Sequence, residues 1–163
     1  MTRKQTSWQQ VRERHIGAMQ TSCDILEHIL QDVTDAQARA LRDGPDGWSI
    51  VEIVCHLRDF DEIFYSRAQM MQAQTQPQLP AYDHEAMAIE RDYQAEDLAE
   101  ALAALKASRA RFIAFLAGLT PEQWERDGVH PERNSFTMTD AAMQVGLHDL
   151  DHLEQITRVL AQG

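Results

Sequence analysis

The sequence has little of what a secreted, membrane-spanning or nucleic-acid-binding protein needs. Its only cysteines in 163 residues are Cys23 and Cys55, which excludes a disulfide framework. The longest apolar run, residues 113–119, has seven residues, whereas a membrane-spanning helix needs about 20. The first ten residues, MTRKQTSWQQ, lack the apolar core of a signal peptide. We therefore expect a reduced, cytoplasmic protein that does not enter a membrane.

Basic side chains are also few. Fifteen Lys and Arg stand against 26 Asp and Glu, which gives a formal net charge of −11. Phosphate backbones and anionic lipid surfaces repel a chain of this charge unless its basic residues are concentrated in one patch, and the sequence contains no such patch. We expect neither nucleic acid nor a membrane surface as a partner.

The sequence does have apolar residues at alternating steps of three and four, the spacing of a helix face turned toward a core. This pattern predicts four long helices, within residues 8–33, 50–71, 98–119 and 138–160. Ser49 and Glu52 fit a capping box at the start of the second helix, and Thr137 or Thr139 can cap the fourth. No segment alternates strictly between apolar and polar residues, so the sequence predicts no sheet.

The connection between the second and third helices is long. Residues 74–93 exceed what a simple antiparallel hairpin of helices needs, and they allow a crossover after which the third helix runs parallel to the second. The predicted fold class is therefore all-α, a four-helix bundle with one long connection and an up-down-down-up order. We expect one domain over residues 1–163, which is long enough to bury a sizeable core.

Two histidines four residues apart lie on the inward side of the last predicted helix. The face that carries them follows steps of three and four through Met138, Ala141, Val145, His148, His152, Gln155 and Val159. Burying two imidazoles without partners would cost on the order of a few kcal/mol each, and a shared metal ion removes that cost. The alternative is that both histidines hydrogen-bond to Asp149, Asp151 or neighbouring carbonyl groups.

A third histidine, His56, lies on the apolar flank of the second predicted helix. Three neutral imidazoles from two helices can hold one divalent ion and leave positions open for water and substrate, as catalytic sites do. The pattern is neither the HExxH motif of zinc proteases nor the paired Glu-x-x-His motifs of di-iron bundles.

These two segments resemble the two motifs of the DinB-like (DinB/YfiT) superfamily. Residues 48–59, WSIVEIVCHLRD, resemble the W-S/T-…-H-L/I-x-D start of that superfamily's second helix. Residues 148–156, HDLDHLEQI, resemble the H-x-x-x-H-x-x-Q-I segment of its last helix. The number of helices, the order of the motifs and the chain length also fit, so the resemblance covers most of the chain.

The resemblance implies a four-helix bundle, often a homodimer, in which three histidines hold a zinc, nickel or iron ion. Carried over to this sequence, the ligands are His56, His148 and His152. Members with known chemistry use low-molecular-weight thiols, as S-transferases or thiol-dependent isomerases, and others are described as hydrolases. Imidazole ligands suit several of these metals, so the ligand type does not decide which one binds.

Further histidines and one arginine are candidates for the surroundings of such a site. His15 lies on the apolar side of the first helix, as a core histidine or as a residue facing the site. His28 and His84 are expected in solvent. His130 and Arg133 belong to a loop before the last helix, and they could contact an anionic substrate if the site opens beside it.

Carboxylates and cysteines near the proposed ligands have weaker claims. Among the carboxylates three or four residues from a ligand, Asp59 is preferred over Glu52 and Asp151 as the group that orients an imidazole. Cys55, next to His56, points about 100° away from it around the helix, so we expect it and Cys23 to be buried structural residues.

The sequence therefore predicts a metal-dependent enzyme that acts on a small molecule. The ion would activate water or a low-molecular-weight thiol for hydrolysis or S-transfer. The alternative is a non-catalytic metal-binding or stress-associated protein with a structural or vestigial site, which a fourth protein ligand such as Asp59 would favour. No catalytic residue is assigned.

Overall fold

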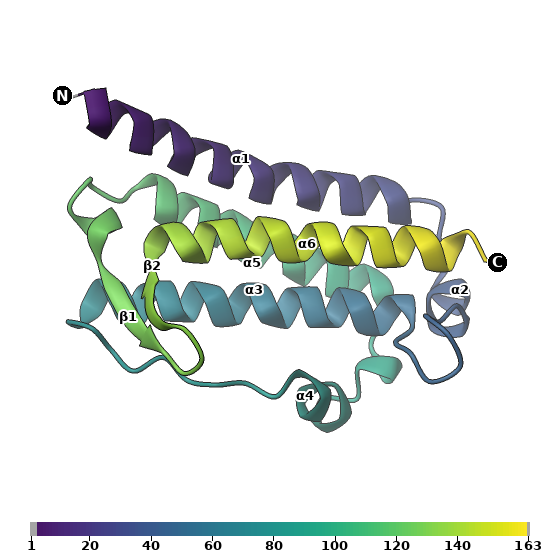
Figure 1. Cartoon of the computed structure of the whole chain (residues 1–163). Helices are drawn as coiled ribbons and strands as arrows, with labels where there is room; N and C mark the ends of the chain where they lie inside the picture. Colours follow the sequence, from purple (N-terminus) through teal and green to yellow (C-terminus); the bar gives the residue numbers. More distant parts are fainter. Residues whose placement is uncertain (1–2, 163) are drawn as a thin grey trace.

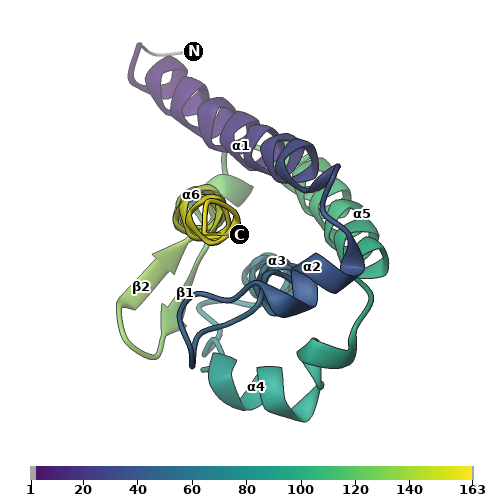
Figure 2. The same cartoon turned by 90° about the vertical axis from the view of Figure 1, so that its right-hand side faces the viewer.

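Four long helices form the body of the computed structural model, which describes residues 3–162 (Figure 1). They are α1 (Arg3–Leu30), α3 (Ile50–Ala73), α5 (Leu98–Ala117) and α6 (Met138–Leu160). α1 and α6 run in one direction and α3 and α5 in the other, so the predicted up-down-down-up bundle is confirmed (Figure 1). Viewed from its end, the bundle places α1 and α3 across from each other, with α5 and α6 completing the ring (Figure 2).

Short elements fill the connections. They are the helices α2 (Asp35–Ala40) and α4 (His84–Glu90) and the single-turn helices η1 (Tyr93–Ala95) and η2 (Gln123–Glu125). The connection after α3 runs back along that helix and carries α4 beside it (Figure 1). Because this connection returns to the end of the bundle where α3 began, α5 starts there and runs parallel to α3.

The beginnings of the helices are fixed by local sequence. Ser49 caps α3: its hydroxyl accepts the Glu52 backbone N–H, and the Glu52 carboxylate accepts the Ser49 backbone N–H at 2.8 Å. Thr137, rather than Thr139, caps α6, with Asp140 as its reciprocal partner. Such boxes satisfy amide groups that a helix start leaves unpaired.

A β-hairpin before α6 is not predicted by the sequence, and the expectation of no sheet is wrong. Strands β1 (Asp127–His130) and β2 (Asn134–Thr137) pair antiparallel. Strands of four residues are too short for a visible alternation, and this pair is supported from outside. The amide of Val129 donates to Pro77, and Leu79 donates to the carbonyl of Val129. Tertiary contacts therefore decide an element that local pattern cannot show.

The apolar core consists of two clusters that follow one another along α3 and α6. One includes the apolar residues between positions 50 and 57 of α3 with Leu153, Ile156 and Val159 of α6. The other includes Phe60 and Phe64 of α3 with Met138, Ala141, Ala142 and Val145 of α6. The polar residues described below lie where the two clusters meet. Within residues 3–162, none of the helices has both the length and the apolar character required to cross a bilayer.

Candidate metal centre

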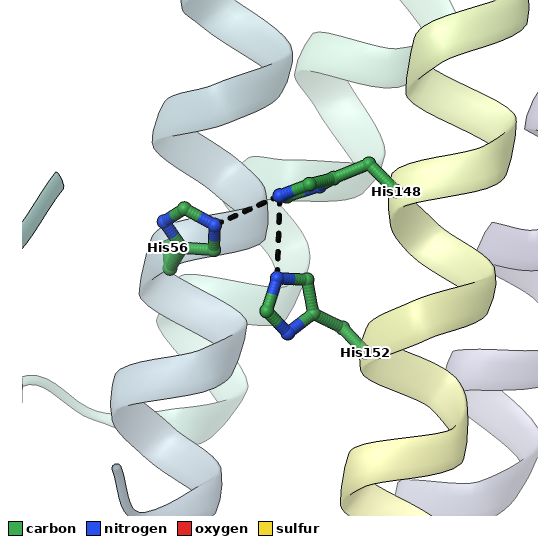
Figure 3. Close-up of side chains that lie close together, drawn as sticks. All are labelled: His56, His148 and His152. Atoms are coloured by element: carbon green, nitrogen blue, oxygen red, sulfur yellow. Dashed lines mark hydrogen bonds between the residues drawn. The ribbon is translucent and has the colours of Figure 1, made fainter. Parts of the chain in front are cut away.

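Three histidines from two helices converge in the interior of the bundle (Figure 3). His56 extends from α3, and His148 and His152 extend from successive turns of α6. The Nε2 atom of His148 lies 3.0 Å from Nε2 of His56 and 3.2 Å from Nε2 of His152. The three ligand nitrogens all lie within 4.8 Å of one another. The structure thus brings together the three residues that the sequence marks as ligands.

The spacing of these nitrogens suits a shared divalent ion. Zinc–nitrogen distances of about 2.0–2.1 Å at tetrahedral angles put neighbouring nitrogens roughly 3.3 Å apart. The observed separations of 3.0 and 3.2 Å are close to that value. Hydrogen bonds alone cannot satisfy the cluster. Nε2 of a neutral imidazole either donates one hydrogen bond or accepts one in the ring plane, whereas Nε2 of His148 faces two other nitrogens. The donor set therefore fits an ion bound at its centre.

The environment keeps the imidazoles neutral, which is the form that binds metal. His56 is only 5% exposed. Burial, followed by the neighbouring imidazoles, lowers the pKa of His56 to about 3 and that of His148 to about 2. Burial also lowers the pKa of His152. Phe60 stacks on the ring of His148 with centroids 3.5 Å apart, so part of this burial is aromatic.

Gln155 fixes the orientation of His152. Its Nε2 donates to an Asp43 carboxylate oxygen at 2.9 Å, because a carboxylate only accepts. Its Oε1 therefore faces Nδ1 of His152, 2.7 Å away, and that nitrogen must carry the proton. The lone pair of His152 is then on Nε2, directed at the cluster. Arg158 holds Asp43 in place through an ion pair.

Sequence analysis places Gln155 on the inward face without giving it this role. The signal that could have found it is its position three residues after His152, on the same side of the helix. Its partner Asp43 precedes α3 by seven residues and only the fold brings it there. Nδ1 of His148, in contrast, is buried and has no hydrogen-bond partner among the described residues.

The carboxylates near the histidines in sequence bind other partners. Asp59 accepts hydrogen bonds from the Tyr93 hydroxyl, from Arg91 at 2.7 Å and from Arg58 at 2.8 Å. It therefore does not orient an imidazole, and that prediction is wrong: the helix spacing puts Asp59 near His56, but Arg58 of α3, Arg91 just after α4 and Tyr93 of η1 bind it instead.

Three other carboxylates are likewise accounted for. Glu52 belongs to the capping box of α3, and Asp151 is exposed. Asp149 points about 100° away from His148 around α6 and pairs with Arg109, and its two oxygens lie 2.7 and 3.1 Å from the guanidinium nitrogens. The alternative in which Asp149 or Asp151 satisfies the two histidines is therefore not what the structure contains.

One of the remaining histidines lies where its sequence context does not indicate. His84, expected in solvent, is half-buried at the start of α4, and its ring centroid lies 5.1 Å from that of His56. It reaches this place because the long connection folds back over α3. His28 is exposed as expected, and His15 is half-buried in α1 outside the cluster.

A cavity of about 140 Å³ opens beside the cluster. Phe60 and His84, which contact the histidines, form part of its wall. His130 and Arg133 also line it, as expected for a site that opens beside their loop. Cys23 and Cys55 are buried, and burial raises the pKa of the Cys55 thiol to about 12, which excludes a thiolate nucleophile there.

Comparison with known proteins assigns the chain to a family. A model of the DinB superfamily matches residues 18–156, a range that contains all three histidines. The chain belongs to the DinB superfamily. Its relatives include YfiT of Bacillus subtilis, a proposed metal-dependent hydrolase, which is 28% identical over 136 residues, or 82% of this chain and 75% of YfiT. A proposed metal-dependent hydrolase of Oceanobacillus iheyensis is 26% identical over 82% of this chain and 76% of its own.

Solved structures place this DinB-like chain in the same fold. The structure of YfiT, described as a probable metal-dependent hydrolase with an unusual four-helix bundle topology, matches with a TM-score of 0.83 at 25% identity. The match covers 99% of this chain and 89% of YfiT. A mycothiol-dependent maleylpyruvate isomerase matches with a TM-score of 0.73 at 12% identity, over 89% of this chain and 60% of the isomerase, and shows the fold alone.

Proposed function

We propose that this DinB-like protein is a metal-dependent enzyme in which His56, His148 and His152 bind one divalent ion. The observation that carries the proposal is an incomplete ligand set beside a cavity. Among the described residues, the group able to share an ion consists of these three histidines, and no carboxylate or thiol joins them as a fourth ligand. Structural zinc sites are closed by four protein ligands, whereas catalytic sites keep a position open.

The reaction class that fits best is hydrolysis of a small molecule. A divalent ion bound at the three Nε2 atoms supplies Lewis-acid chemistry, which activates water or holds a thiol as thiolate. Gln155 keeps His152 in the ligating tautomer, and Phe60 shields His148 from solvent. His84 contacts His56 and lines the cavity, so its imidazole is placed to hydrogen-bond a group bound in the cavity.

S-transfer from a low-molecular-weight thiol is the second candidate. What favours it is the shared fold with a mycothiol-dependent isomerase, and the cavity beside the cluster could admit a thiol. Hydrolysis is preferred because the relatives with the higher sequence identity are proposed hydrolases. That the ion is zinc, nickel or iron, that the protein is a homodimer and that it is cytoplasmic all stay predictions.

Elemental analysis of tag-free protein tests the metal site. We expect about one divalent ion per chain in the parent and none in His148→Ala, with an unchanged helical circular dichroism spectrum. His15→Ala is the matched control, because His15 is a half-buried histidine outside the cluster. Metal content in His148→Ala equal to that of the parent would show that the ligand set is wrong.

Cobalt substitution separates an enzyme from a protein with a closed site. If a coordination position is open, azide or 2-mercaptoethanol should change the visible absorption of the cobalt-loaded protein. An unchanged spectrum with both ligands would favour the non-catalytic alternative. A change with the thiol but not with azide would favour S-transfer over hydrolysis.

A further inference from the structure

The cavity wall also contains a buried arginine without a counter-ion, which the proposed function does not use. Arg67 of α3 is only 5% exposed and lines the cavity. Its Nη2 donates to the carbonyl oxygen of Pro80 at 2.6 Å, whereas its Nε has no hydrogen-bond partner. The guanidinium lies over two aromatic rings, 5.2 Å from the centroid of Phe64 and 5.3 Å from that of Tyr82.

No carboxylate among the described side chains forms an ion pair with this guanidinium. Within residues 7–162, none of the ion pairs includes Arg67, although Glu132 also lines the cavity. Burial lowers the pKa of Arg67, but a guanidinium stays charged in proteins. A buried cation without a counter-ion is costly, and the cost is relieved when an anion binds beside it.

Arg67 and the histidine cluster lie at opposite ends of one helix face. His56, Phe60, Phe64 and Arg67 follow one another on α3 at steps of four, four and three. At a rise of 1.5 Å per residue, the Cα atoms of His56 and Arg67 are about 16 Å apart along the axis. Between them, Phe60 and Phe64 stack with ring centroids 4.2 Å apart and form an apolar wall of the cavity.

We propose that Arg67 binds a carboxylate group of the substrate, while the reactive end of the same molecule reaches the histidine cluster. The apolar middle of that molecule packs against the parts of Phe60 and Phe64 that line the cavity. The substrate class is thus an elongated carboxylate rather than a neutral molecule. The placement of the reactive end rests on the proposed function, whereas the carboxylate site at Arg67 does not.

The geometry of Arg67 favours a carboxylate over other anions. Nε and Nη2 lie at one edge of the planar guanidinium, and the Nε–H has no partner, so this edge can match the two oxygens of a carboxylate. A volume of about 140 Å³ also suits a small group better than a large polyanion.

Calorimetric titration with a carboxylate and its neutral amide tests the proposal. The probes are 3-phenylpropanoate and 3-phenylpropanamide, added to metal-free and to zinc-loaded protein. We expect the acid to bind at least tenfold more tightly than the amide in both forms, and inorganic phosphate at equal concentration to displace it poorly. In Arg67→Met, the preference for the acid should disappear, and in Arg67→Lys it should fall to an intermediate value.

Arg126→Met is the matched control. Arg126 also donates to main-chain carbonyls near the end of α3, to Met71 at 2.7 Å and Gln74 at 2.9 Å, but it does not line the cavity. This variant should keep the preference for the acid. Equal binding of acid and amide to the parent, or an undiminished preference in both Arg67 variants, would overturn the proposal.

The two proposals can fail separately. Zinc content of Arg67→Met should equal that of the parent, since Arg67 lies outside the histidine cluster. A parent protein that selects the acid but binds no metal would contradict the proposed function and leave the carboxylate site standing. A parent that binds zinc but does not select the acid would contradict the carboxylate site alone.

Discussion

Two polar clusters lie buried on α3 and α6, and they differ in whether the chain itself satisfies them. The first is the group of three histidines. The second is centred on Arg109 of α5, which is 2% exposed, and it includes carboxylates of α3 and α6. His148 and Asp149 are neighbours in sequence, yet they point about 100° apart around α6 and belong to different clusters.

The arginine cluster is complete within the chain. Arg109 donates to Asp61 at 2.5 Å, to Asp149 at 2.7 Å and to the carbonyl of Met19 at 2.6 Å. Ser108 donates to Asp61 at 2.6 Å, and Ser22 donates to Asp149. These contacts join all four long helices, and no buried side-chain atom of the cluster lacks a partner within the described residues.

The histidine cluster is incomplete by the same measure. Its three Nε2 atoms point at one another, and Nδ1 of His148 has no partner. The chain satisfies five buried polar side chains in the neighbouring arginine cluster, whereas it provides no such partners for the histidine nitrogens that face one another. The contrast separates a structural network from a group that awaits a ligand, and it is the physical reason to treat the histidines as functional.

The largest expected effect is on the complete cluster. Replacing Arg109 with Met leaves Asp61 and Asp149 buried without a cation, so we expect the free energy of unfolding to fall by about 3–5 kcal/mol. Urea unfolding followed by circular dichroism measures it. Arg111→Met, on the same helix, breaks an exposed pair with Glu62 and should cost only about 0–1 kcal/mol. Equal losses in both variants would contradict the comparison.

The next effect concerns the open cluster. Zinc at a free concentration 100 times its Kd should raise the free energy of unfolding by about 2.7 kcal/mol, because the ion binds the folded chain and not the unfolded one. Thermal unfolding with and without zinc measures the gain. His148→Leu should show no gain at the same zinc concentration; a gain equal to that of the parent would place the ion elsewhere.

Gln155 sharpens the comparison from outside the ligand set. Gln155→Leu removes the acceptor that keeps the proton on Nδ1 of His152, so we expect metal affinity to fall by about 10–100-fold. Competition with a chromophoric chelator measures it. Gln144→Leu is the control, because Gln144 lies on the same helix but bonds to Arg133 instead of a ligand histidine. An unchanged affinity in Gln155→Leu would mean that the tautomer of His152 does not limit binding.

The smallest effect distinguishes the two clusters in the absence of metal. In chelator-treated protein, His148→Leu should change the free energy of unfolding by no more than about 1 kcal/mol, and in the stabilising direction. The reason is that it removes a buried nitrogen without a partner and keeps an apolar contact with Phe60. A loss comparable to that of Arg109→Met would show that the histidines are held together by structure rather than kept for a ligand.

Much of the fold can be predicted from the sequence because helices are encoded locally. The start of α3 after Ser49 and both ends of α6 agree with periodicity and capping. Histidine positions on the inward faces of α3 and α6 also follow from spacing, so the three histidines could be grouped before the structure was known.

Contacts between distant segments could not be predicted in the same way. His84 reaches His56 because a connection folds back over α3, and Asp43 reaches Gln155 across 112 residues. Asp59 shows the opposite error: spacing puts it near His56, but Arg91 and Tyr93 bind it instead. A polar side chain has no periodic signal for its partner, because partner choice depends on which elements pack together.

The sequence by itself determined the helices, their order and the three histidines that face the interior, since each depends on residues within a few turns of one another. Only the tertiary structure decided which polar groups find partners. Arg109 is neutralised by carboxylates from two other helices, whereas Arg67 lines a cavity and the three histidines face one another. The difference arises because burial and electrostatic pairing act through space, between helices whose packing no local pattern specifies.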